Sequence, residues 1–110
     1  MNDKEVLAAL YATVENRRDN PKEGSYTCYL LDKGIDKILK KVGEECSETI
    51  IAAKNGVKSE TVYETADLIY HLMVMLVQQE IPLDDVLAEL DRRSEKTGNL
   101  KKFHVVDKNS

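Results

Sequence analysis

Hydrophobic residues recur every three or four positions along most of this chain, which is the period of an amphipathic α-helix. Four segments carry the pattern, and Asn20-Pro21, Asn55-Gly56 and Ile81-Pro82 separate them with residues that end helices. No alternating pattern is long enough to predict a β-sheet. The sequence therefore predicts an all-α fold with four main helices, at about residues 3–18, 35–54, 59–80 and 84–98.

The two middle helices differ in how their apolar residues are distributed. The second helix has one apolar stripe, whereas the third is apolar on almost every side from Ala66 to Val77. The stripe comprises Ile35, Ile38, Leu39, Val42, Cys46, Thr49, Ile50 and Ala53. Because their link is short, these helices should be antiparallel neighbours in a helical bundle. A helix that is apolar all round needs more cover than a small bundle gives, so we expect a homodimer with the third helix near its interface.

The other segments carry weaker signals. Residues 20–33, NPKEGSYTCYLLDK, contain Pro, Gly, Ser and three β-forming residues, and we expect an ordered loop with one extended turn. Residues 99–110 have no helical period and are expected to form a C-terminal tail that is partly disordered. Residues 1–98 then form a single domain of ordinary size.

Composition and charge restrict the class of protein. The formal net charge is −4, which argues against non-specific nucleic-acid binding. No run reaches about 18 apolar residues, so no membrane span is expected. The N-terminal MNDKEVLAAL lacks the basic start of a secretion signal, which favours a cytoplasmic protein. Cys28 and Cys46 have no zinc-ligand spacing and are interpreted as packing residues.

Three acids of the run GEECSE lie beside the stripe of the second helix. A helix advances 100° per residue, which places Glu45 about 60° from Val42, at the border of the core. Glu48 lies further out, at about 120°, and Glu44 furthest, at about 160°. Taken alone, such acids are common on solvated helix faces, where they pair with neighbouring lysines.

Two further acids, Glu64 and Asp67, lie within about 60° of His71 on the third helix. Asp67 is in the apolar run, where an unpaired carboxylate is costly. Acids that face one another across two helices repel, and a divalent cation removes the repulsion. Oxygen ligands favour Mg²⁺ or Mn²⁺ over zinc, and His71 is at most a group that orients a ligand. A buried Asp67 that is merely hydrogen-bonded is the alternative.

Lysines accompany the acids of the second helix. Lys37 and Lys41 lie on the same side of that helix as Glu48, where they could contact phosphate oxygens that a metal leaves uncovered. They could equally be solubilising charge, together with Lys33 and Lys40. A metal cage beside cations is typical of a protein that acts on polyphosphates.

The motifs together resemble a known family. EExxE followed by ExxD resembles the all-α nucleoside-triphosphate pyrophosphohydrolase superfamily, which includes MazG-type enzymes and dimeric dUTPases. The longer match, SYTCYLLDKGIDKILKKVGEECSETIIAAK, then ETADLIYHLMVML and DVLAELDRR, resembles the phosphoribosyl-ATP pyrophosphohydrolase family over roughly residues 6–93. The SYT segment and the GxxKxxKKxGEE run carry the narrower resemblance. Members are often fused to a cyclohydrolase domain, for which this chain has no room.

The resemblance implies a MazG-like helical bundle and a reaction. Phosphoribosyl-ATP and water give phosphoribosyl-AMP and pyrophosphate, in the second step of histidine biosynthesis, with Mg²⁺ as cofactor. The implied metal ligands are Glu45, Glu48, Glu64 and Asp67. Glu48, or Glu44 instead, is expected to activate the attacking water. The expected substrate contacts are Ser25, Tyr26, Thr27, Lys37 and Lys41.

Two alternatives stay open at this point. One is a house-cleaning pyrophosphatase for dUTP or other non-canonical triphosphates, which the SYT segment and the paired lysines before GEE disfavour. The other is a non-catalytic helical dimerisation module, in which the acids make structural ion pairs.

Overall fold

A computed structural model describes residues 2–95 of the chain, and the predicted tail at 99–110 and the predicted helix end near Gly98 lie outside the described residues. A 3-10 turn, η1, covers Asp3–Glu5. The α-helices are α1 at Val6–Asp19, α2 at Tyr26–Lys33, α3 at Ile35–Asn55, α4 at Lys58–Gln78 and α5 at Leu83–Glu95. This range contains no strand, which confirms the all-α prediction. None of its helices is long and apolar enough to cross a membrane.

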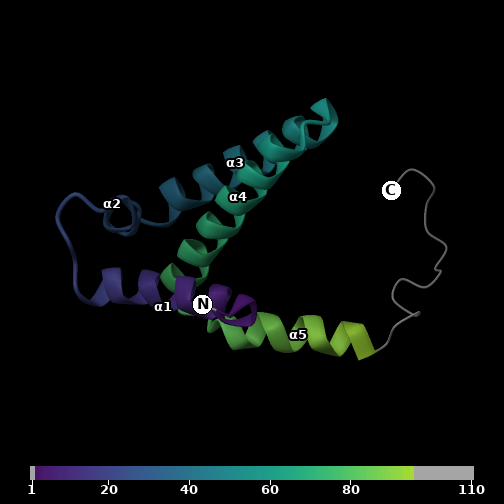
Figure 1. The fold of residues 1–110 in the computed structure, drawn as a ribbon. Helices are drawn as coiled ribbons and strands as arrows, with labels where there is room; N and C mark the ends of the chain where they lie inside the picture. The colour runs from purple at the N-terminus through teal and green to yellow at the C-terminus, as the bar shows by residue number, and fades with distance from the viewer. Residues whose placement is uncertain (1, 96–110) are drawn as a thin grey trace.

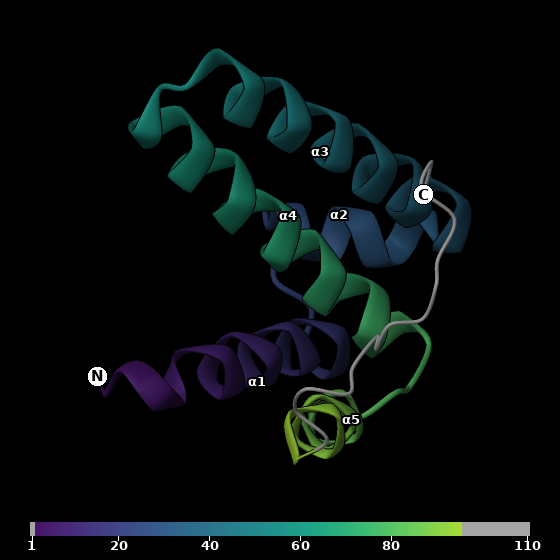
Figure 2. The ribbon, with the colours of Figure 1, turned by 90° about the vertical axis from the view of Figure 1, so that its right-hand side faces the viewer.

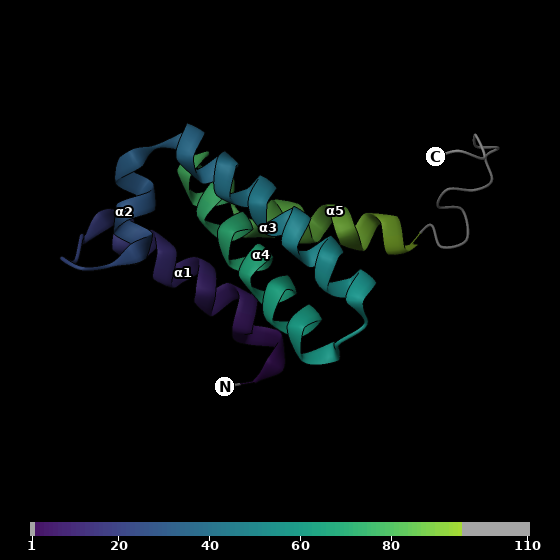
Figure 3. The ribbon, with the colours of Figure 1, turned by 90° about the horizontal axis from the view of Figure 1, so that it is seen from above.

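The helices form a base and a projecting arm. α3 and α4 pack as an antiparallel hairpin, as predicted, and their linked end projects away from α1 and α5 (Figures 1 and 2). α2 lies between the start of α3 and the end of α1. Seen from above, α1 and α5 extend to opposite sides of the arm (Figure 3). The hairpin therefore has one end packed in the base and one end covered only by itself.

The hydrophobic core surrounds the second half of α4. Every other α-helix contributes at least one side chain to it. Its buried members are Val14, Leu30, Ile38, Met73, Val74, Leu76, Val77 and Leu83. Four of these belong to α4, which explains why the sequence is apolar on almost every side there. The same packing fixes α3 against α4 and so fixes the relative positions of their polar side chains.

The prediction of a loop over residues 20–33 is wrong for its second half, because α2 is a helix. The Ser25 side chain caps it by accepting a hydrogen bond from the Cys28 backbone N–H, at 3.1 Å. Leu30 is fully buried in the core. Such burial overrides the β propensity of the residues in this short segment. The bundle therefore has five α-helices in its described part rather than four.

The buried face of α3 also differs from the predicted stripe. The buried residues of this helix are Ile38, Glu45 and Ala52. Four members of the stripe are exposed instead, namely Leu39, Cys46, Ile50 and Ala53. α3 turns Glu45 toward α4, so much of its apolar stripe faces away from the chain's own core. The interpretation of Cys46 as a packing residue is consequently wrong within a single chain.

Two glycines of α3 give opposite predictions for stability. Gly56 ends the helix in the left-handed region, at φ +77°, and open space surrounds its Cα. We expect Gly56→Ala to lower the free energy of unfolding by about 1 kcal/mol, because alanine is strained there.

Gly43 lies inside the helix with the same open space, and Gly43→Ala should raise the free energy of unfolding by up to about 1 kcal/mol. Urea denaturation measures both, and shifts of the same sign would contradict the assignment.

Candidate active site

Four carboxylates meet where α3 faces α4. Oxygen atoms of Glu45, Glu48 and Glu64 lie within 4.8 Å of one another. Ligand atoms of Glu45, Asp67 and His71 form a second group within the same distance. Glu45 belongs to both groups and is only 4% exposed. The hairpin thus brings together all four acids predicted as metal ligands, which are called the acid cluster below.

The acid cluster contains carboxylate oxygens that nothing in the described chain satisfies. One oxygen each of Glu45 and Glu64 is buried and has no hydrogen-bond partner. Burial, and then the negative charge of Asp67, raise the pKa of Glu45 to about 7. Burial, and then the charge of Glu48, also raise the pKa of Glu64. Unpaired oxygens that repel one another fit a hard divalent cation such as Mg²⁺ or Mn²⁺.

Glu44 lies outside the acid cluster. Its carboxylate is 3.2 Å from the Lys41 ammonium nitrogen, whereas Glu45 lies 3.8 Å from that nitrogen. The hydrogen bond to Glu44 raises the pKa of Lys41. Glu48 is exposed at the edge of the cluster, and a cavity of about 160 Å³ lies between it and Glu64. Of the two acids predicted to activate water, Glu48 therefore lies beside the other acids of the cluster and Glu44 beside a lysine.

His71 joins the acid cluster to α2. Its Nδ1 lies 2.8 Å from the Asp67 carbonyl oxygen and 3.2 Å from the Asp67 carboxylate. Because a carbonyl only accepts, Nδ1 carries a proton, and the Nε2 of a neutral imidazole then accepts from the Tyr26 hydroxyl at 3.0 Å. His71 is 2% exposed and so holds this arrangement away from solvent. It is placed to orient Asp67, the role that the sequence analysis allowed it.

The SYT segment attaches the start of α2 to α4. The Thr27 hydroxyl is hydrogen-bonded to the Tyr70 hydroxyl, and Ser25 is engaged as the helix cap. The Tyr26 ring stacks on Tyr70, with ring centroids 6.2 Å apart, and meets His71 edge-on at 5.8 Å. Among the three substrate contacts predicted in this segment, only Tyr26 presents an exposed side chain, at 46%. Tyr70 was not predicted, although it directly precedes His71 in the apolar run.

Lys37 lies further along the same surface. Its ammonium nitrogen is 5.9 Å from the centroid of the Tyr29 ring, and that of Lys33 is 5.8 Å away. Tyr29 is 43% exposed. Sequence reasoning did not select Tyr29 or Lys33 as contacts. These two residues lie one turn apart on α2, but Gly34 separates α2 from α3, so no single helical period links them to Lys37.

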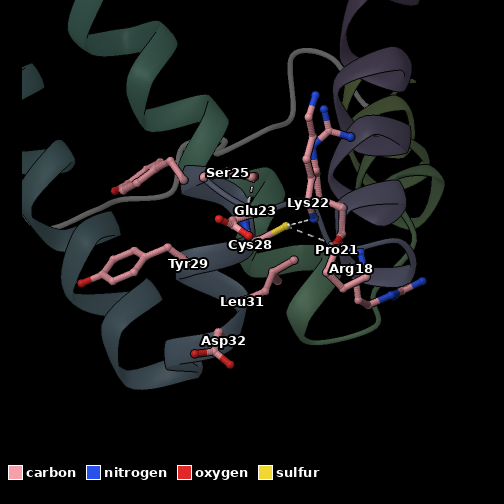
Figure 4. Close-up of a pocket in the computed structure, with 12 residues that line it drawn as sticks. Arg18, Pro21, Lys22, Glu23, Ser25, Cys28, Tyr29, Leu31 and Asp32 are labelled. Atoms are coloured by element: carbon pink, nitrogen blue, oxygen red, sulfur yellow. Dashed lines mark hydrogen bonds between the residues drawn. The ribbon is translucent and has the colours of Figure 1, made fainter.

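A larger cavity, called the cavity behind α2 below, is also lined by Ser25, Tyr26 and Tyr29. It occupies about 830 Å³ between α1, the loop before α2 and α2 itself, and Figure 4 shows its lining. The Cys28 thiol donates to the Arg17 carbonyl at 3.4 Å and accepts from the Lys22 backbone N–H at 3.3 Å. Hydrogen bonding to Ser25 and Lys22 lowers the pKa of Cys28. This cavity contains none of the acid cluster.

Comparison with known proteins identifies the family. The family model described as phosphoribosyl-ATP pyrophosphohydrolase matches residues 7–94. A phosphoribosyl-ATP pyrophosphatase of Clostridium botulinum is 54% identical, with 92% of each chain covered. One from Limosilactobacillus fermentum is 61% identical over 79% of this chain and 82% of the relative.

A longer relative matches over part of its length. It is a histidine biosynthesis bifunctional protein of Caldanaerobacter subterraneus, 60% identical over 84% of this chain. The present chain spans 45% of that relative's length. With a family model that covers most of the chain and relatives above half identity, this chain belongs to the phosphoribosyl-ATP pyrophosphohydrolase family.

Proposed function

We propose that this chain hydrolyses phosphoribosyl-ATP to phosphoribosyl-AMP and pyrophosphate, a step of histidine biosynthesis, with Mg²⁺ or Mn²⁺ as cofactor. The observation that carries the metal dependence is the pair of buried, unpartnered oxygens of Glu45 and Glu64 within a cluster of oxygen ligands. The names of the relatives support the substrate. Glu45, Glu48, Glu64 and Asp67 would hold the cation.

Different side chains of the site would take the proton, contact the base or ribose, and bind the phosphates. A bound divalent cation supplies charge neutralisation on the polyphosphate and lowers the pKa of a coordinated water. Glu48 is exposed and, unlike Glu44, forms no ion pair with a lysine within residues 2–95, so it is the acid best placed to take the proton of the attacking water. Tyr26 offers an exposed ring to the base or ribose. Lys37 and Lys41 offer cations to phosphate oxygens.

The decisive experiment measures pyrophosphate release from phosphoribosyl-ATP, ATP and dUTP with Mg²⁺. We expect phosphoribosyl-ATP to be the preferred substrate. Asp67→Asn should lower kcat roughly 100-fold or more, because one metal ligand supports several kcal/mol of transition-state stabilisation. The circular-dichroism signal of helix should persist in the variant.

Each contrary outcome identifies an alternative. Turnover of dUTP without turnover of phosphoribosyl-ATP would indicate a house-cleaning pyrophosphatase. The absence of any turnover, together with a melting temperature that Mg²⁺ leaves unchanged, would indicate a non-catalytic dimerisation module. Near-normal activity of Asp67→Asn would remove Asp67 from the ligand set.

The raised pKa of Glu45 predicts how stability depends on pH. The folded protein holds this proton more tightly than the unfolded chain, so the stabilisation present below about pH 4.5 is lost as the pH rises through about 7. The melting temperature of the metal-free protein should fall by several degrees between about pH 5 and about pH 8. Saturating Mg²⁺ should reverse the fall at high pH, since the cation neutralises the carboxylates. An equal fall in Glu45→Gln, which cannot titrate there, would assign the effect elsewhere.

We further propose that two copies form a homodimer through the exposed stripe of α3. Leu39 and Ile50 are 47% and 69% exposed, and Val62 and Tyr63 on α4 are each 68% exposed. Apolar side chains gathered on both helices of one arm are uncommon on a monomer's surface. A second copy supplies the cover that the arm's free end lacks.

A substitution within the stripe tests the dimer. Ile50→Glu should convert the dimer to a monomer at micromolar concentration, because a carboxylate would be buried at the contact without a partner. Ile50→Leu is the matched control and should keep the dimer. Sedimentation velocity measures both masses, and circular dichroism checks that the helices remain. Unchanged mass in Ile50→Glu would exclude this face as the interface.

A further inference from the structure

From the acid cluster to the junction of α2 and α3, the surface presents first two tyrosine rings and then two lysines. Tyr26 follows His71, with ring centroids 5.8 Å apart, and Tyr29 follows Tyr26 at 6.1 Å with an interplanar angle of 22°. Lys33 and Lys37 then lie 5.8 and 5.9 Å from the Tyr29 centroid. Tyr26, Tyr29, Lys33 and Lys37 are called the tyrosine–lysine strip below.

The cations of this strip have no carboxylate partner within residues 2–95. Lys41 forms an ion pair with Glu44, and Arg18 forms one with Asp19. Neither Lys33 nor Lys37 has an ion-pair partner within the described part of the chain. Their cation–π contacts with the exposed Tyr29 ring are weak. The ammonium groups can therefore still donate hydrogen bonds to an anion. Two like charges beside one ring repel each other, and an anion between them would relieve this repulsion.

Phosphoribosyl-ATP differs from ATP by one phosphoribosyl group and therefore carries a second phosphate, apart from the triphosphate. We propose that the tyrosine–lysine strip binds this phosphoribosyl arm, with Lys33 and Lys37 on its phosphate and the rings of Tyr26 and Tyr29 against the base and ribose. The inference rests on the proposed function and deepens it. It makes Lys33 the residue that distinguishes phosphoribosyl-ATP from ATP, whereas Tyr29 contacts the part that both nucleotides share.

The cavity behind α2 is the competing location for the arm. It shares Tyr26 and Tyr29 with the strip but not Lys33 or Lys37. Its cations are Arg17, Arg18 and Lys22, and it is also lined by the acids Glu23 and Asp32, which repel phosphate. Figure 4 shows the Tyr29 ring directed away from Cys28 and Lys22. The strip, in contrast, combines two unpaired cations with a continuous aromatic path to the acid cluster. The observations therefore favour the strip.

Kinetics on two substrates test the assignment. Lys33→Met should lower kcat/KM for phosphoribosyl-ATP about tenfold, as expected for a lost charge-assisted contact, and should leave kcat/KM for ATP unchanged. Lys40→Met is the matched control, because Lys40 is an exposed lysine of the same region outside the strip, and it should change neither value. Tyr29→Leu should weaken both substrates, whereas Tyr29→Phe keeps the ring and should restore them.

A binding measurement without metal separates this inference from the proposed function. Calorimetry compares phosphoribosyl-AMP with AMP, neither of which carries the pyrophosphate that the acid cluster would hold. The wild-type protein should bind phosphoribosyl-AMP at least about tenfold more tightly, and Lys33→Met should abolish the difference. Lack of phosphoribosyl-ATP turnover overturns the proposed function, and the calorimetry still decides the strip.

Three results would overturn the inference itself. The first is an equal loss of kcat/KM on both substrates in Lys33→Met. The second is a preference for phosphoribosyl-AMP that survives in this variant or is absent from the wild type. The third is loss of that preference in Arg17→Met or Lys22→Met, which would move the arm to the cavity behind α2.

Discussion

The burial of Glu45 between α3 and α4 is the constraint on which the rest of the site depends. An apolar residue at this position would serve the stability of the hairpin better, because a buried carboxylate loses its hydration. The apolar core around Val74 and Ile38 offsets this cost by holding the two helices together. Since the helices cannot separate to hydrate Glu45, the acid either keeps a proton or shares a cation. The packing of the fold thereby supports the proposal that the acid cluster holds a divalent cation.

α2 carries the proposed substrate contacts, and one histidine joins it to the acid cluster. Ser25 and Thr27 use their hydroxyls to fix α2, so Tyr26 is held in place with its ring exposed. The Tyr26 hydroxyl reaches Asp67 through His71. A shift of α2 would thus disturb a predicted metal ligand as well as the aromatic surface. The SYT segment therefore fixes α2 in place through Ser25 and Thr27, and its exposed side chain, Tyr26, is available to bind substrate.

Helical periodicity was sufficient to predict which acids of α3 and α4 come together, but not that α2 is a helix. The period placed Glu45 and Glu48 toward α4 and Glu44 away from it, and the coordinates agree. α2 escaped prediction because its eight residues are few for a periodic signal and its helical state depends on burying Leu30. The exposed part of the α3 stripe escaped it too, since apolarity alone does not say whether the same chain or a second copy provides the cover.

Different faces of α3 serve the core, the proposed dimer interface and the proposed substrate surface. Ile38, Glu45 and Ala52 face the chain's own core. At 100° per residue, Lys37, Lys41 and Glu48 lie about 140° to 180° from Ile50, so the proposed interface and the proposed substrate surface point in nearly opposite directions. A partner bound on the stripe would leave the acid cluster accessible. Rotating α3 about its axis would bury the stripe only by turning Glu45 away from Asp67, so the exposed apolar face is a consequence of assembling the acids.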